Sequence, residues 1–430
     1  MKRLLMISYP FPPNSSAGAT RSERFARYLT EFGWQVEVVT IRPRRDLFED
    51  TARVDQFGSD VRMHFTRTVD PWLWLNYRNT NHPLLRIARS AAMRVFSFPD
   101  HMLLWTPFAV SEARRICRSN RIDAVYTTSP PHSTHLAGMI LSSRTGIPWV
   151  ADFRDPWTLN AYRKNGSLKT IGFRTERWLE TCVLKNARAV LANTEANKHN
   201  LEKEFAFIGG KKLIHLPNGW EDFSLNVVYP KTPDNGTFRI VHAGTFYPRF
   251  KPYGLLHALA DWKYGNKPAE IFSLEKNQLR VVLIGSRDPE TRRVIERLDL
   301  EDYVTITPWI AQEEARAEMS RADMLWATLG TSKESATYVP SKLLEYISAK
   351  RPIIGFFPEG EAKRLIDRSS TGRVFTSDDP EPVIRFLDNA IRRKLQGTLQ
   401  DYAPNHEFLE SIRVRNVVER FAAILNEISL

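Results

Sequence analysis

Cysteine is scarce in this sequence, and long hydrophobic runs are missing from it. Two cysteines, Cys117 and Cys182, are too few for a disulfide framework or a zinc cluster, a pattern that suits a reducing compartment. No apolar stretch approaches the ~20 residues that span a bilayer. The apolar run near the start stops at Ser8, which makes it too short for a secretion signal. We therefore expect a cytoplasmic protein.

Two nucleotide-binding signatures are also absent. No two of the 20 glycines are separated by a single residue, which excludes the dinucleotide-binding fingerprint of dehydrogenases. Gly355 and Gly360 have the spacing of a P-loop, but Glu361 stands where that motif requires lysine. Neither an NAD-dependent dehydrogenase nor a P-loop enzyme is therefore predicted.

The chain has the length and the composition of a globular protein with more than one domain. Its 430 residues are too many for one ordinary core, so two or more domains are expected. Hydrophobic residues make up 42% and charged residues 26%, which is typical of a soluble globular chain. The net charge of +12 favours an anionic partner: phosphates, nucleic acid or a membrane surface.

Strand and helix patterns alternate along the chain, which predicts an α/β fold. Residues 4–7 predict a buried strand, residues 22–32 an amphipathic helix and residues 36–41 a second strand. This order is typical of parallel sheets with crossover helices. A second cycle begins at residues 238–244, after a proline-rich stretch at 227–236 that has the composition of a linker. We predict two doubly wound parallel-sheet domains.

Polar segments follow several predicted strands in the first half of the chain. The residues concerned are Ala17 and Gly18 after the first strand, His132 after another, and Asp152, Arg154 and Asp155 after a third. Because open α/β sheets bind ligands at the carboxyl ends of their strands, these segments should line one cleft. Two plainer interpretations stay open. In the first, Gly18 only allows the turn between strand and helix. In the second, Arg154 pairs with an acid and caps the next helix.

The stretch 337–356 predicts a loop, a short helix, a turn and a buried strand. Pro340 and Ser341 suit the start of a helix. A helix that begins at Ser341 and Lys342 directs free N–H groups and a partial positive charge at what lies before it, which suits a diphosphate. Glu345, about one turn later, is placed to accept two hydrogen bonds from a diol such as a ribose. That Glu345 is simply a solvated helix residue is an equally open interpretation.

The run PSKLLEYISAKRPII, residues 340–354, resembles the nucleotide-sugar motif of GT-B-fold glycosyltransferases of the retaining family 4. The resemblance implies two Rossmann-like domains, the second of which binds the sugar nucleotide. In that family the second acid of a Glu-x7-Glu pair holds the donor ribose, and Glu345 matches it. Thr337 stands in the place of the first acid. The order of segments matches the family over nearly the whole chain.

The resemblance implies roles for further residues. The loop at Ala17 and Gly18 resembles the donor-phosphate loop, and Arg154 stands where the family commonly has a histidine that touches the donor sugar. The candidate donor-binding residues are Ala17, Gly18, Gly244, Arg249, Lys251, Ile310, Thr337, Pro340, Ser341, Lys342 and Glu345, and the candidate catalytic residues are Arg154, Asp155, Asp152 and His132. The metal-binding Asp-x-Asp motif of the other glycosyltransferase fold does not occur. We expect no metal and no cofactor beyond a nucleotide-diphosphate sugar as co-substrate.

These features together predict a retaining glycosyltransferase. It would move a sugar from a nucleotide-diphosphate sugar to an acceptor hydroxyl, in the assembly of a surface polysaccharide or a glycolipid. We predict an acceptor-side domain at 1–225, a nucleotide-sugar domain at 226–400, and a terminal helix at 401–430 that returns to the first domain. A GT-B nucleotide-sugar epimerase and a basic nucleic-acid-binding protein are the alternatives. No nucleic-acid-binding signature accompanies the positive charge, so no nucleic-acid partner is expected.

The stretch 71–99 contains no Asp or Glu, whereas four arginines interleave with aromatic residues there. The arginines are Arg78, Arg86, Arg89 and Arg94. Apolar residues recur at helical spacing between them, so this helix would suit the headgroup plane of a membrane. We therefore predict an anionic membrane surface as a partner, at the inner face of the cell membrane, and a saccharide or lipid-linked acceptor. Packing of the same apolar stripe onto the first domain stays open.

Overall fold

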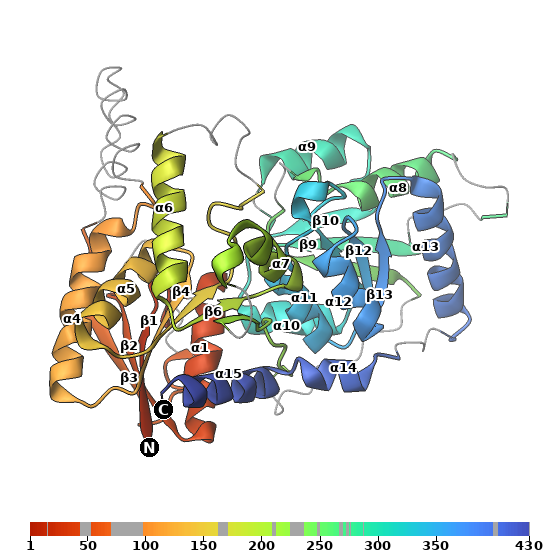
Figure 1. Ribbon diagram of the computed structural model, residues 1–430. Helices are drawn as coiled ribbons and strands as arrows, with labels where there is room; N and C mark the ends of the chain where they lie inside the picture. Colours follow the sequence, from red (N-terminus) through yellow and green to blue (C-terminus); the bar gives the residue numbers. More distant parts are fainter. Residues whose placement is uncertain are drawn as a thin grey trace, which may run out of the picture. The chain divides into compact units, whose positions relative to one another are not determined.

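The computed structural model describes residues 1–14, 16–43, 53–69, 98–161, 171–208, 212–223, 236–246, 250–265, 270–271, 275, 277–286, 288–398 and 403–429. The chain forms two compact units (Figure 1). Unit 1 consists of Met1–Asn218 together with Val414–Leu430, and unit 2 consists of Gly219–Arg413. The predicted stretch 71–99 lies almost entirely outside the described residues, as does most of the predicted linker at 227–236.

Unit 1 is built on a seven-stranded, all-parallel sheet with the strand order β3-β2-β1-β4-β5-β6-β7. Its strands are β1 (Lys2–Ile7), β2 (Trp34–Ile41), β3 (Val61–Thr66), β4 (Ala124–Ser129), β5 (Trp149–Phe153), β6 (Ala189–Ala192) and β7 (Leu213–His215). Its helices are α1 (Ala17–Leu29), η1 (Thr30–Phe32), η3 (Leu103–Trp105), α4 (Thr106–Ser119), α5 (Ser133–Thr145), α6 (Ile171–Asn186), α7 (Glu195–Glu204), η5 (Ala206–Ile208) and α15 (Val414–Ile428).

The first sheet is buried on both faces, as expected of a parallel sheet covered by crossover helices. Alternate residues of β1 belong to different cores: Leu5 packs in a cluster with residues of α4, α5 and α6, and Leu4 packs in a cluster with residues of α1 and α15. In the latter cluster the ring of Phe421 lies 4.9 Å from the ring of Phe25 and 5.2 Å from that of Tyr126. The last helix of the chain therefore completes the core of unit 1.

Unit 2 is built on a six-stranded, all-parallel sheet with the strand order β10-β9-β8-β11-β12-β13. Its strands are β8 (Phe238–Ala243), β9 (Leu279–Ile284), β10 (Val304–Thr307), β11 (Met324–Thr328), β12 (Ile353–Phe356) and β13 (Gly372–Phe375). Its helices are α8 (Gly254–Lys263), α9 (Pro289–Arg297), α10 (Gln312–Ser320), η8 (Lys333–Ser335), α11 (Ser341–Ser348), α12 (Glu361–Ser369), α13 (Pro380–Leu395) and α14 (His406–Ser411).

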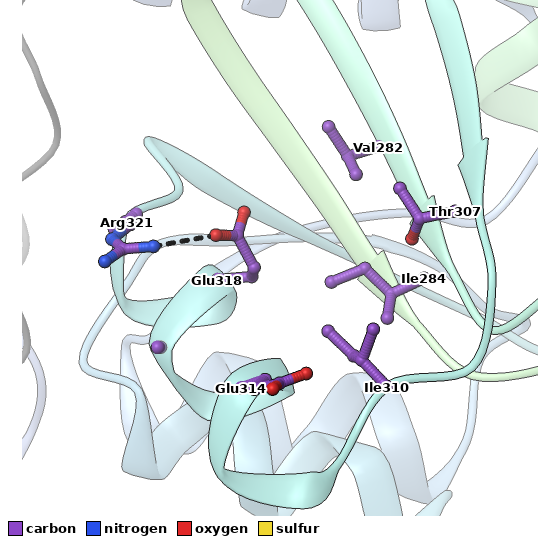
Figure 2. Close-up of a pocket in the computed structure, with 8 residues that line it drawn as sticks. Val282, Ile284, Thr307, Ile310, Glu314, Glu318 and Arg321 are labelled. Carbon is purple, nitrogen blue, oxygen red and sulfur yellow. Dashed lines mark hydrogen bonds and ion pairs between the residues drawn. The ribbon is translucent and has the colours of Figure 1, made fainter.

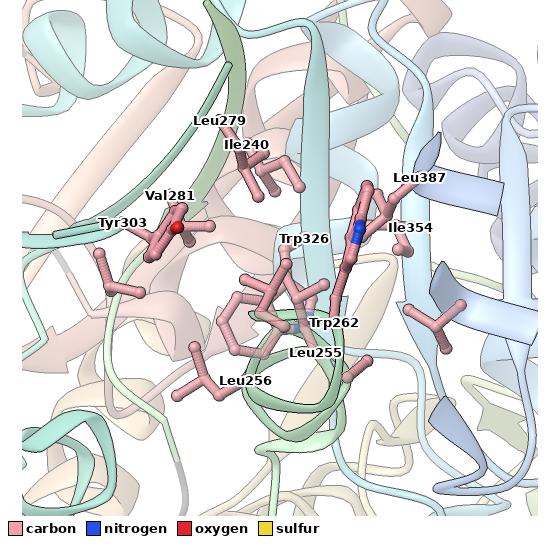
Figure 3. Close-up of a cluster of buried hydrophobic side chains, with 14 of the residues drawn as sticks. Ile240, Leu255, Leu256, Trp262, Leu279, Val281, Tyr303, Trp326, Ile354 and Leu387 are labelled. Atoms are coloured by element: carbon pink, nitrogen blue, oxygen red, sulfur yellow. The ribbon is translucent and has the colours of Figure 1, made fainter. Parts of the chain in front are cut away.

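Large apolar side chains fill the space between the second sheet and helices α8, α9 and α13 (Figure 3). Trp326 of β11 and Trp262 of α8 are both buried in this core, and Leu387 joins them from α13. Ile240 and Val281 add the middle strands β8 and β9. This packing holds the central strands of unit 2 in place, and the candidate site lies at their ends.

The predicted fold class is confirmed, and most predicted elements lie close to their observed bounds. The division between the units falls at Asn218 and Val414, whereas the sequence prediction placed it at 225 and 400. α14 therefore belongs to unit 2, and only α15 joins unit 1. Trp220 and Arg413, which flank these divisions, pair as an isolated parallel bridge. Within the described part of the chain, no helix is both long and apolar enough to cross a membrane.

Candidate functional site

Each sheet has one point where the order of its strands reverses. In unit 2 this point lies between β8 and β11, which are neighbours although two strands separate them in the sequence. In unit 1 it lies between β1 and β4. Loops that leave neighbouring strands there in opposite directions open a crevice at the carboxyl ends, where α/β sheets bind ligands. Most of the predicted site residues lie at these two places, so each unit is described separately.

In unit 2, Gly244 follows β8, and the side chain of Lys342 lies against it. The φ angle of Gly244 is 110°, a conformation that favours glycine. A Cβ built at Gly244 would lie 2.5 Å from Nζ of Lys342 and 2.6 Å from its Cε, so a larger residue would displace the lysine. Gly244 therefore meets two requirements, an unusual backbone angle and a close approach by Lys342.

The ammonium of Lys342 has oxygen and nitrogen acceptors but no carboxylate bonded to it among the described residues. Its Nζ donates to the carbonyl of Thr245 at 3.2 Å and lies 3.5 Å from Nε2 of His242. Burial lowers the pKa of Lys342 to about 8, and the nearby Glu345 only partly opposes this. A half-buried cation in this state gains from any anion that approaches it.

α11 begins beside this lysine, and its first turn is open to a ligand. Pro340, the cap residue, makes no side-chain hydrogen bond to the first turn, and Ser341 is exposed. The N–H groups and the partial positive charge of the helix start thus lie next to the ammonium of Lys342. Glu345 is half-buried, and no described residue bonds its carboxylate. Thr337 is half-buried in the loop between η8 and α11.

The loop after β8 reaches the end of β11. Lys251 is exposed and has a φ of 47°. A Cβ at Gly330, which follows β11, would collide with the carbonyl oxygen of Phe250 and lie 3.4 Å from that of Lys251. Lys251 is therefore held at the same strand reversal as Lys342. Arg249, also predicted to bind the donor, lies outside the described residues.

A pocket of about 460 Å³ lies beside the ends of β9 and β10 in unit 2 (Figure 2). Its lining residues are Val282, Ile284, Thr307, Ile310, Glu314, Ala317, Glu318 and Arg321. Ile310 is the one residue predicted to bind the donor that lines it. The buried hydroxyl of Thr307 has no hydrogen-bond partner among the described residues. The carbonyl of Ile284 accepts the N–H of Gly244 at 2.7 Å, so the pocket and Gly244 are neighbours.

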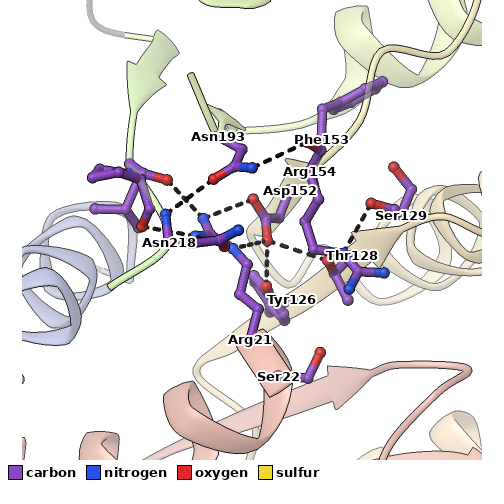
Figure 4. Close-up of polar contacts among 12 residues, drawn as sticks. Arg21, Ser22, Tyr126, Thr128, Ser129, Asp152, Phe153, Arg154, Asn193 and Asn218 are labelled. Atoms are coloured by element: carbon purple, nitrogen blue, oxygen red, sulfur yellow. Dashed lines mark hydrogen bonds and ion pairs between the residues drawn. The ribbon is translucent and has the colours of Figure 1, made fainter. Parts of the chain in front are cut away.

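In unit 1, the side chain of Arg154 binds backbone carbonyls at the strand reversal (Figure 4). It donates through Nε to Ser129 at 3.0 Å, through Nη2 to Pro130 at 2.7 Å, and through Nη1 to Gly18. Gly18 belongs to the first turn of α1, where Ala17 is exposed. Burial lowers the pKa of Arg154, against the effect of Asp155. Arg154 thus ties the start of α1 to the end of β4.

Asp152 is a core residue and does not face this crevice. Its buried carboxylate accepts hydrogen bonds from Nε and Nη2 of Arg21, at 2.7 and 3.0 Å, and from the hydroxyls of Tyr126 and Thr128. Arg21 also donates to the carbonyl of Leu216 at 2.9 Å (Figure 4). These four hydrogen bonds hold the carboxylate of Asp152 in the core of unit 1.

Asp155 and His132 are the other two candidate catalytic residues, and both are half-buried. No described residue bonds the carboxylate of Asp155. Burial raises its pKa, against the opposing charge of Arg154. The ring of His132 stacks on Trp157, with centroids 4.9 Å apart and planes at 2°. The structure therefore brings Arg154, Asp155 and His132 to the ends of β4 and β5. Asp152 is buried in the core of unit 1.

Two residues in these networks carried no recognisable signal in the sequence. Arg21 stands just before the predicted amphipathic helix at residues 22–32, and a charged residue there is normally expected to face solvent. His242 lies within a predicted buried strand, and nothing in that pattern marks it as a partner of Lys342. The structure buries both of them, Arg21 against Asp152 and His242 beneath Lys342.

Several solved structures are similar to this chain over nearly its whole length. Sucrose-phosphate synthase from Thermosynechococcus elongatus has a TM-score of 0.64 and 15% identity, over 100% of this chain and 99% of its own. Anabaena HepE, solved with UDP, has a TM-score of 0.63 and 16% identity, over 99% and 100%. WaaG, a glycosyltransferase of lipopolysaccharide biosynthesis, has a TM-score of 0.58 and 14% identity, over 98% and 99%. These likenesses show that the chain has the GT-B fold.

The sequence match is confined to the first half of the chain. Residues 16–219 match the family described as glycosyl transferase 4-like domain, which is nearly all of unit 1 apart from β1 and α15. No curated protein matches the sequence. The predicted resemblance to GT-B glycosyltransferases of family 4 is therefore confirmed.

Proposed function

We propose that this protein is a retaining glycosyltransferase that binds the diphosphate of a sugar nucleotide in unit 2. The observation that carries this proposal is Lys342, a half-buried ammonium to which no carboxylate of the described residues is bonded, beside the open start of α11. A diphosphate offers the negative charge that both features lack. It also fits the position at a strand reversal, where α/β sheets bind nucleotides.

The other residues of unit 2 complete this donor site. Lys251 adds a second cation near the phosphates, so that the site neutralises the leaving diphosphate without a metal ion. The carboxylate of Glu345, which no described residue bonds, accepts hydrogen bonds from the two hydroxyls of the ribose. The part of the Ile310 pocket that lies next to Gly244 is lined by apolar side chains. We assign this pocket to the nucleoside base. HepE, which shares the fold, was solved with UDP, and this supports a nucleoside diphosphate as the ligand here.

Unit 1 carries the groups that we assign to the acceptor. No described residue bonds the carboxylate of Asp155, and burial raises its pKa, which suits a group that accepts a proton. Arg154 holds the start of α1 and the end of β4 in place. Trp157, which is buried, holds the ring of His132 in place by stacking on it. The acceptor we propose is a saccharide or a lipid-linked saccharide.

The first experiment measures nucleotide binding and the products of turnover. Calorimetry with UDP, GDP, ADP and dTDP should find at least one ligand, and Glu345→Ala should weaken it by roughly 1.5–3 kcal/mol, the range for hydrogen bonds to a charged group. Incubation with the matching sugar nucleotide and an acceptor extract should release free nucleoside diphosphate, with or without EDTA. A sugar changed in the absence of any acceptor would instead indicate the epimerase. Unaltered affinity in a folded Glu345→Ala variant would remove Glu345 from the site.

The membrane surface is part of the same proposal and rests on the sequence of residues 71–99. Each arginine near an anionic leaflet contributes about 1 kcal/mol, so four of them would give reversible docking. Co-sedimentation with vesicles of anionic and of neutral lipid tests this. Binding should require the anionic lipid, weaken with salt, and fall when Arg86, Arg89 and Arg94 are replaced by glutamine. Equal recovery with both vesicle types would favour a soluble acceptor.

A further inference from the structure

A buried histidine lies directly beneath Lys342 in unit 2. His242 is near the end of β8, with only 2% of its surface exposed. Its ring stacks on that of Phe246, with centroids 4.1 Å apart and planes at 19°, so the ring cannot turn freely. A polar ring in such a place needs partners for both of its nitrogens.

The hydrogen bonds of His242 determine which nitrogen carries the proton. Nδ1 lies 2.8 Å from the carbonyl oxygen of Trp326, which can only accept, so the proton is on Nδ1. The other nitrogen, Nε2, then presents a lone pair. It faces Nζ of Lys342 at 3.5 Å, which is long for a hydrogen bond and would shorten with a small shift of the flexible lysine.

The imidazole stays neutral in these surroundings. Burial and the neighbouring Lys342 hold the pKa of His242 well below its usual range. The other ionisable groups on the adjoining helix are Glu345, which favours the charged form of the lysine, and the buried Tyr346, whose hydroxyl accepts the N–H of Ala243 at 2.9 Å. His242 is therefore an acceptor for the ammonium and does not compete with it as a second cation.

We propose that His242 is a positioning residue that holds Lys342 in place and keeps it charged for the donor diphosphate. An ammonium has three N–H donors. Nε2 of His242, at 3.5 Å, is placed to take one after a small shift of the lysine, and the carbonyl of Thr245 takes another at 3.2 Å, which leaves the third for a ligand at the start of α11. This inference rests on the proposed donor site. It adds to that site a residue, His242, that stabilises the charged form of Lys342.

Three variants test the proposal with UDP, GDP, ADP and dTDP as probes. His242→Phe keeps the stack on Phe246 and removes both ring nitrogens. His242→Gln restores an N–H for Trp326 and an oxygen for Lys342. Lys342→Met removes the cation itself. The dissociation constant is measured by calorimetry from pH 7 to 9.5, and thermal melts record the stability of each variant.

The wild-type affinity should be constant up to about pH 8 and then weaken about tenfold per pH unit, because the lysine must be charged to bind. His242→Phe should move this decline to lower pH and weaken binding at pH 7 by roughly tenfold, the size of one hydrogen bond to a charged group. His242→Gln should restore both the affinity at pH 7 and the pH at which binding declines. A purely structural role would lower the melting temperature and leave the pH of the decline unchanged.

The outcomes separate the two hypotheses. If the wild type binds none of the four nucleoside diphosphates, the proposed function fails first. If the wild type binds and His242→Phe shows the wild-type pH profile, the role of His242 is refuted. The remaining case is that His242→Phe weakens binding by a route other than Lys342, and the double variant of His242→Phe with Lys342→Met tests it. His242→Phe should add nothing to the loss caused by Lys342→Met, and an undiminished further loss would show that His242 acts by another route.

Discussion

Replacing Gly244 by alanine should weaken donor binding by moving a lysine that the substitution does not alter. The φ angle of 110° is one that alanine adopts only at a cost of about 1–3 kcal/mol. The new Cβ would lie 2.5 Å from Nζ of Lys342, closer than any relaxed contact, so the ammonium must leave its place. One hydrogen bond from a charged group contributes about 1.5–3 kcal/mol. The expected loss of affinity for UDP or GDP is therefore roughly 10- to 150-fold.

Gly265 offers a matched control in the same unit. It follows α8 with a φ of 80°, and a Cβ built there meets nothing within 4 Å. Gly265→Ala should therefore cost stability through its backbone alone and leave nucleotide affinity unchanged. Calorimetry and thermal melts on both variants separate the two effects. Wild-type affinity in a folded Gly244→Ala protein, or an equal loss in Gly265→Ala, would refute the role given to the contact with Lys342.

Four further outcomes are expected. Asp155→Asn should lower kcat by about 10²-fold and leave nucleotide affinity intact, since a positioned acid–base group contributes at least that much; wild-type turnover would make Asp155 structural. In the wild type, activity should decline on acidification at a pH above the ordinary range of an aspartate, because the pKa of Asp155 is raised. Asp152→Asn should lower the free energy of unfolding by about 3–5 kcal/mol in denaturant melts, because Arg21 would keep a buried, poorly paired charge. Phe421→Ala should cost about 3–5 kcal/mol through the cavity it leaves, and a change below 1 kcal/mol would contradict the packing of α15 in unit 1.

Elements with strong local signals were predicted near their observed bounds. Pro340 and Ser341 predicted the start of the helix now seen at Ser341–Ser348, and the following strand was predicted at 353–357 and is observed at Ile353–Phe356. The first helix begins at Ala17, about one turn before the predicted residue 22. Its first turn consists of small and polar residues, which carry no amphipathic pattern.

The alternation of strands and helices was enough to predict two doubly wound sheets, since the period of hydrophobic residues reports which face of each element is buried. The partner of a polar side chain has no such local signal. Arg154 reaches Gly18 across 136 residues, Asp152 pairs with Arg21 across 131, and Lys342 meets His242 across 100. Which of these groups meet depends on the order of the strands in each sheet. Asp152 and Asp155 are therefore two similar acids in one short run of sequence, yet the fold buries the first in an ion pair and leaves the carboxylate of the second without a bonded partner among the described residues.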